Sequence, residues 1–101
     1  MKITQETYDE LISYLENNTT RFVKSNQILV NVPEIKNSVN LREMVNHLRT
    51  NGNTIVSSSL GYKLSNDYDE IFTCIVNLKH RASQISSAAL GMLTSTSTKL
   101  I

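Results

Sequence analysis

Apolar residues recur at helical spacing in three segments of the first half of the chain, 4–17, 26–32 and 38–50. They fall three or four residues apart with polar residues between them, which predicts three amphipathic helices. The first helix has two alternative N-caps, Thr4 or the box formed by Thr7 and Glu10. We expect these helices to bury Tyr8, Leu11, Ile12 and Leu15 in the first, Ile28, Leu29 and Val32 in the second, and Leu41, Met44, Val45 and Leu48 in the third.

The residues between these segments predict where each helix begins and ends. Residues 21–24 favour a short strand, and Ser25 after them is a suitable N-cap for the second helix. Pro33 would remove a hydrogen bond inside a helix, so we expect the second helix to end near it and residues 34–37 to form a turn. Gly52 suits the end of the third helix.

The second half of the chain predicts a hairpin and one long helix. Two β-favouring arms, 54–57 and 62–65, flank a segment that ends in Gly61, and Tyr62 alternates with Leu64 on the expected packed side. Asn66-Asp67 can cap a helix with a sustained apolar spacing of three and four residues. We expect a domain over 1–66, a packing or dimerisation helix over 67–94 and a mobile tail over 95–101.

The order of these elements is that of a winged helix-turn-helix domain, in which the hairpin is the wing. The local sequence also resembles small phage and prophage winged-helix proteins. In those proteins a recognition helix that ends in LRxxG is followed by the motifs I.S and GY, then by a helix that starts with D..E and a helix that contains L..RA..I. The matching residues are Leu48-Arg49…Gly52, Ile55…Ser57, Gly61-Tyr62, Asp67…Glu70 and Leu78…Arg81-Ala82…Ile85. The resemblance covers about residues 21–92 and implies a mainly α fold with a small antiparallel β-wing. Segment 32–37 departs from it by replacing the short turn usual between the second and third helices.

The near-neutral total charge of +1 hides an uneven distribution. Residues 1–20 carry a net charge of −3, residues 21–66 carry +4 and residues 67–101 are neutral. Positive charge is therefore concentrated in the segment that would form the helix-turn-helix and wing, as a DNA-binding surface requires.

The third helix holds the best candidates for reading bases. Arg42 and Asn46 carry groups that bond bidentately to guanine and adenine. The open alternatives for Arg42, Asn46 and Arg49 are base contact, phosphate contact and a merely solvated helix face. For Tyr62 we favour a packing role over a DNA contact. The residues that we expect at DNA are Lys36, Asn37, Ser38, Asn40, Arg42, Asn46, Arg49, Ser58, Ser59 and Lys63.

The last helix is long for a domain of this size. About 28 residues at ~1.5 Å each reach ~42 Å, whereas a compact chain of this length is about 33 Å across. Its first half, widened by Phe72 and Val76, can pack on the domain core. Its second half suits either self-association or packing on the first helix. The expected dimerisation residues are Leu78, Ala82, Ile85, Ala89 and Met92.

We therefore expect a double-stranded DNA-binding protein, a transcriptional regulator or an accessory factor for replication or excision, acting as a homodimer. The alternative is a protein-interaction module that binds a host or phage replication protein without specific DNA binding, which the modest charge and the altered turn favour. No motif indicates an enzyme, a cofactor or a metal site, and Cys74 fits a buried apolar position in a reducing compartment. Without a leader or membrane segment we expect a cytoplasmic protein, in the host cell if phage-encoded.

Overall fold

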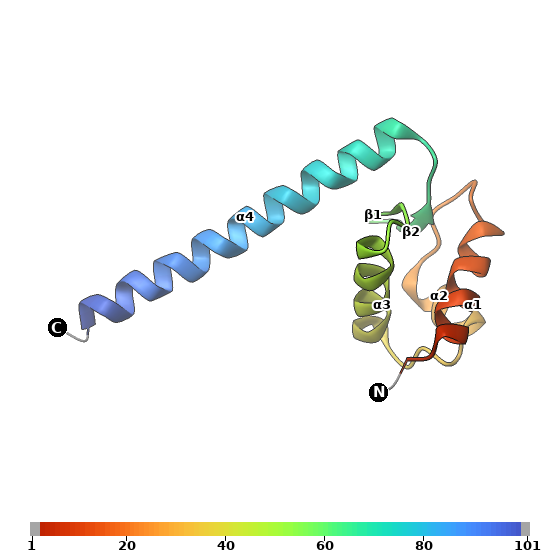
Figure 1. Ribbon diagram of the computed structural model, residues 1–101, viewed down its shortest axis with the longest axis horizontal. Coiled ribbons are helices and arrows are strands. Elements are labelled where there is room, and N and C mark those ends of the chain that lie inside the picture. Colours follow the sequence, from red (N-terminus) through yellow and green to blue (C-terminus); the bar gives the residue numbers. More distant parts are fainter. Residues whose placement is uncertain (1–2, 100–101) are drawn as a thin grey trace. The chain divides into compact units, whose positions relative to one another are not determined.

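The computed structural model describes residues 3–99, with side chains through Ser95. Its elements, in order, are α1 (Gln5–Glu16), α2 (Ser25–Asn31), α3 (Ser38–Thr50), β1 (Ile55–Ser58), β2 (Gly61–Leu64) and α4 (Tyr68–Lys99) (Figure 1). The protein is thus mainly helical with a small two-stranded antiparallel sheet. The chain divides into two compact units at the step from Ile71 to Phe72, five residues beyond the expected boundary at 66.

Helix α1 forms as its apolar spacing predicts. The Thr4 hydroxyl accepts a hydrogen bond from the Thr7 backbone N–H, so Thr4 is the N-cap and not the Thr7…Glu10 box. Leu11 and Leu15 are fully buried, while Tyr8 and Ile12 pack against the core at its edge.

The segment before α2 pairs with the hairpin through one residue instead of a full strand. The Val23 N–H donates to the Tyr62 carbonyl at 2.7 Å, and the Tyr62 N–H donates to the Val23 carbonyl at 2.9 Å. Lys24 is the last extended residue, so the helix begins at Ser25. The prediction that Ser25 would be the N-cap was wrong, because the pairing of Val23 ends the extended segment one residue earlier.

Between α2 and α3 the chain forms the turn that Pro33 predicts, but this turn also contributes to the core. Ile35, which the sequence placed in an ordinary turn, is 2% exposed, and its N–H donates to the Val32 carbonyl at 3.0 Å. Val32 is buried beside it. Two apolar anchors, Val32 and Ile35, therefore fix this connection to the core.

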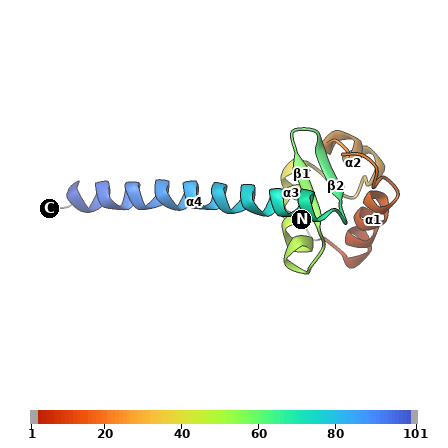
Figure 2. The same cartoon turned by 90° about the horizontal axis from the view of Figure 1, so that it is seen from above.

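The core of the first unit lies between the three short helices and the hairpin (Figure 2). All four apolar residues predicted for α3 are buried, and α3 spans the predicted residues. The buried apolar cluster comprises Leu11, Leu15, Val23, Ile28, Val32, Ile35, Leu41, Met44, Val45, Leu48 and Ile55.

The hairpin pairs Ile55 with Leu64 and Ser58 with Gly61, so its connecting loop is Ser59-Leu60. Both strands lie one residue toward the tip of the predicted arms. Gly61 has φ +122°, and a Cβ there would collide with the Val23 carbonyl. Only glycine therefore permits both the turn and the pairing with Val23.

Helix α4 begins as predicted after Asp67, whose carboxylate accepts from the N–H groups of Asp69 (2.8 Å) and Glu70 (3.3 Å). It runs to Lys99, so helical backbone replaces the expected tail over 95–99, and residues 100–101 lie outside the described residues. The physical reason is that serine and threonine weaken a helix without breaking it, and neither proline nor glycine follows Gly91. Over residues 3–99, no helix carries the apolar stretch that a membrane span needs.

Candidate nucleic-acid interface

Helix α3 has one fully anchored side and one open side. Leu41, Met44, Val45 and Leu48 fasten it to the core. On the opposite side Arg42 and Asn46 are exposed, and within the described residues the Arg42 guanidinium forms no ion pair. The helix is thus held rigidly while its outward polar groups stay available to a ligand.

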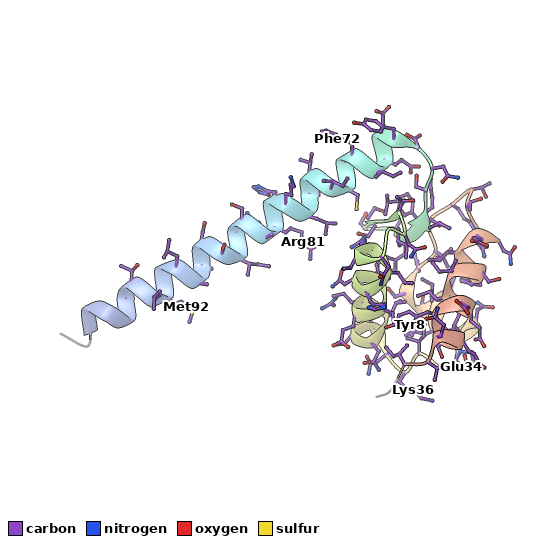
Figure 3. The ribbon with its side chains drawn as sticks, viewed as in Figure 1. Tyr8, Glu34, Lys36, Phe72, Arg81 and Met92 are labelled. Carbon is purple, nitrogen blue, oxygen red and sulfur yellow. The ribbon has the colours of Figure 1, made fainter. Side chains whose placement is uncertain are left out.

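The N-terminal end of α3 is also open. The Asn37 side chain accepts from the Asn40 N–H at 2.9 Å, so Asn37 acts as the N-cap and its amide oxygen is already used. Asn40 is partly buried, whereas Ser38 is exposed. Lys36 is exposed in the turn that leads into the helix (Figure 3). A cation therefore lies at the end of the helix that enters the groove first in helix-turn-helix docking.

Arg49 occupies a different place from the one that the helical pattern indicated. Its side chain is partly buried, with Nε donating to the Ile55 carbonyl at 2.8 Å and Nη2 to the Ser57 hydroxyl at 3.0 Å. These bonds fasten the end of α3 to strand β1. Arg49 therefore joins α3 to the hairpin, and Nε and Nη2 are already used in these hydrogen bonds.

The cation on the hairpin is neutralised within the same unit. The Lys63 ammonium lies 2.7 Å from Glu70 Oε2 and 5.2 Å from the centre of the Phe22 ring. Glu70 also accepts from the Ser65 hydroxyl at 3.0 Å. The expected phosphate contact of Lys63 would thus have to replace an existing ion pair.

At the tip of the hairpin Ser58 and Ser59 are exposed, as a phosphate-contacting tip requires. The Ser58 hydroxyl accepts from the Leu60 N–H at 3.0 Å, which shapes the loop. Tyr62 is partly buried and packs against the core, which matches the packing role favoured from its alternation with Leu64.

Negative charge gathers on another part of the unit, where α1 meets the turn before α3. A side-chain hydrogen bond with Glu34 is the main cause that raises the pKa of Glu10, followed by desolvation and by repulsion from Glu34 and Glu6. Figure 3 shows Glu34 beside the lower part of α1. The first unit thus carries an acidic surface on α1, while its exposed cations are Arg21, Lys24, Lys36 and Arg42, of which Lys36 lies in the same turn as Glu34.

The His47 ring contacts other side chains of the first unit. Its ring lies 4.8 Å from the Tyr8 ring, and Nε2 is 3.2 Å from the Asn51 side-chain amide. Within the described residues, histidine, cysteine and carboxylate side chains nowhere gather in a group of three that could hold a metal. Cys74 is partly exposed on α4 instead of buried.

The expected dimerisation residues all lie on α4. Ala82, Ile85, Ala89 and Met92 are exposed and Leu78 is partly exposed. Phe72, Arg81 and Met92 project from the helix at three points along it (Figure 3).

Comparison with models of known protein families, with curated proteins and with solved structures gave no match. Sequence reasoning missed the partners of Lys63 and Arg49, because Glu70 and Ile55 meet them only through tertiary packing. For Arg49, the signal in the sequence was its position near the buried edge of α3, which could have indicated its hydrogen bonds to strand β1.

Proposed function

We propose that this chain is a winged-helix protein that binds double-stranded DNA by placing α3 in the major groove, with the hairpin as the wing. The observation that carries the proposal is the two-sided character of α3. Its inner side is fixed by four buried residues, and its outer side presents Arg42 and Asn46. We further propose that it acts as a transcriptional regulator or as an accessory factor in replication or excision.

The chemistry of the outer side suits base recognition. The major groove of B-DNA admits one α-helix, and its base edges offer paired groups to a guanidinium or an amide. Arg42 and Asn46 are four residues apart, so they lie about one turn from each other on the same side. Lys36, just before the helix, is placed to contact a phosphate and so to set the register.

The exposed cations also set the expected strength and salt dependence. Arg21, Lys24, Lys36 and Arg42 are exposed and form no ion pair within the described part of the chain. If three or four of them meet phosphates, log K against log salt has a slope of about −3 for each copy. Binding to random sequence is then micromolar or weaker at physiological salt.

The direct test is fluorescence anisotropy of a labelled random-sequence duplex at low and at physiological salt. Arg42→Gln and Glu43→Gln form a matched pair, because they remove opposite charges from neighbouring exposed positions of α3. The proposal predicts weaker binding for the first and tighter binding for the second. Glu6→Gln makes the same charge change as Glu43→Gln on α1, and its effect should be smaller.

Absence of binding at low salt would reject DNA as the ligand. Equal gains from Glu43→Gln and Glu6→Gln would show a response to net charge alone and would remove α3 from the interface.

A protein partner is the second candidate, and one observation favours it. Val39 is 52% exposed on the outer side of α3, and Glu43 beside Arg42 lowers the positive charge of that side. An apolar residue bordered by charged residues matches the layout of a protein interface, which is apolar at its centre and polar at its rim. Val39→Ser separates the candidates, because it would weaken a protein complex while changing affinity for random DNA little.

A further inference from the structure

Helix α4 carries an apolar seam whose side chains are largely exposed from Ile75 to Met92. From Tyr68 to Met92, residues spaced alternately by three and four lie on one side of the helix. The side chains of Ile75, Ile85 and Met92 on this seam are exposed, as are Phe72 and Leu93 at its border. We propose that this seam pairs with α4 of a second copy of the chain, and that the two helices run antiparallel.

The exposed apolar side chains of α4 indicate that this helix packs against a partner. A single helix in water gains little from its intrinsic propensity and depends on burial of one face. Contiguous exposed apolar residues mark an association surface.

The apolar residues of the first helix are already used within the first unit. Leu11 and Leu15 of α1 are fully buried in the first unit, and Tyr8, Ile12 and Tyr14 pack against the same core. Before α4, the exposed large apolar residues described in that unit are Val30 on α2, Val39 on α3 and Leu60 in the hairpin loop, so they form no continuous seam. Among the described residues, a second α4 is therefore the surface that offers a matching seam, and packing on α1 is not proposed further.

The order of large and small residues along the seam selects the antiparallel direction. In the register that centres the pair between residues 83 and 84, Leu78 faces the partner's Ala89, and Ala82 faces the partner's Ile85. Each small residue then receives a large one, as close packing requires. In a parallel pair Ala82 would face the partner's Ala82 and Ala89 the partner's Ala89, and two layers would leave voids.

The ends of the seam fit the same register. Ile75 faces the partner's Met92, and Phe72 lies beside the partner's Leu93. Six large apolar side chains from each copy, at about 60–120 Å² each, cover roughly 700–1,400 Å² in total. That area reaches the lower range of specific interfaces, which indicates a dimer of moderate affinity.

Charge does not oppose this arrangement. Between residues 72 and 95 the charged residues are Lys79 and Arg81, and both border the seam. In the antiparallel register Lys79 faces the partner's Ser86 and Arg81 the partner's Ala88. No ion pair is needed within this stretch, so added salt should leave the dimer intact, in contrast to DNA binding.

Two substitutions of matched exposure test the seam. Ile85 is 69% exposed on the seam and Leu90 is 63% exposed to one side of it. In sedimentation equilibrium of the full chain at tens of micromolar, the parent and Leu90→Asp should be dimers, and Ile85→Asp should be a monomer. A monomeric parent, or equal effects of both variants, would overturn the proposal.

Disulfide trapping tests the direction. In a Cys74→Ser background, Ile75→Cys with Met92→Cys should form a covalent dimer in a glutathione buffer, and neither substitution alone should do so. In a parallel pair each single substitution would give a covalent dimer, and that result would overturn the antiparallel assignment. Neither experiment uses DNA, so its outcome stands apart from the outcome of the binding test.

Discussion

The ammonium group of Lys63 lies 2.7 Å from the carboxylate of Glu70, which ties strand β2 to the first turn of α4. The pair is partly buried, and the Ser65 hydroxyl holds the same carboxylate. The hairpin therefore presents less positive charge than its sequence implies. DNA binding, in our proposal, depends on α3 and on the turn before it more than on the wing cation.

This difference predicts unequal effects of two lysine substitutions. Lys36→Ala should reduce the salt slope of DNA binding by about 0.9, because one phosphate contact is lost. Lys63→Ala should change the slope little, because its charge is already paired. Anisotropy titrations at several salt concentrations measure both slopes. A larger loss for Lys63→Ala than for Lys36→Ala would contradict the proposed interface.

A second prediction concerns Arg49. Removal of its guanidinium leaves the Ile55 carbonyl and the Ser57 hydroxyl without their partner, so Arg49→Ala should lower the free energy of unfolding by about 1.5–3 kcal/mol. Urea denaturation measures this loss. Arg42→Ala is the matched control, and its stability should stay within about 0.5 kcal/mol of the parent. Unchanged stability of Arg49→Ala would return this residue to the candidate DNA contacts.

Two glycines give a third prediction, because both have positive φ but differ in the space around them. A Cβ at Gly52 meets nothing within 4 Å, whereas a Cβ at Gly61 collides with the Val23 carbonyl. Gly52→Ala should cost about 1 kcal/mol of stability from backbone conformation alone. Gly61→Ala should cost more than about 3 kcal/mol, because the Val23–Tyr62 pairing must also open. Equal melting temperatures for the two variants would refute this account of the hairpin.

The contact between Glu10 and Glu34 predicts a dependence of stability on pH. The hydrogen bond with Glu34 raises the pKa of Glu10, so the folded state binds a proton more tightly than the unfolded state does. Stability from this pair is thus fully present below the ordinary carboxyl pKa and is lost as pH rises through the raised pKa.

Glu10→Gln should remove the loss of stability that accompanies a rise in pH, because glutamine carries no titrating carboxyl group. Its melting temperature should exceed that of the parent at neutral pH, and the difference should shrink in acid. Glu16→Gln, a carboxylate near the other end of α1, serves as the control for a general charge effect. A Glu10→Gln gain that stays constant from acid to neutral pH would speak against the shared hydrogen bond.

Local signals in the sequence predicted most of the elements but not the partners of their side chains. Helical spacing identified α3 to the residue, and Gly52 and Asp67 marked helix ends by their backbone preferences. Ile35 was missed because a turn between two helices has no periodicity to show which side chain turns inward. The α4 helix ran past its predicted end because a run of serine and threonine is compatible with both helix and coil.

The candidate site was harder to predict for the same reason. Exposure of Arg42 and Asn46 followed from their position opposite Leu41 and Met44. The ion pair of Lys63 and the hydrogen bonds of Arg49 join residues that approach only in the folded unit, and no spacing rule reports them.

In the proposed function α3 is the surface that meets DNA, and ¹⁵N–¹H NMR with a short random-sequence duplex tests this directly. We predict salt-sensitive shift changes for backbone amides between Lys36 and Asn46 and at Ser58 and Ser59, with α1 unaffected. Shift changes centred on α1, or none at millimolar DNA and low salt, would contradict it.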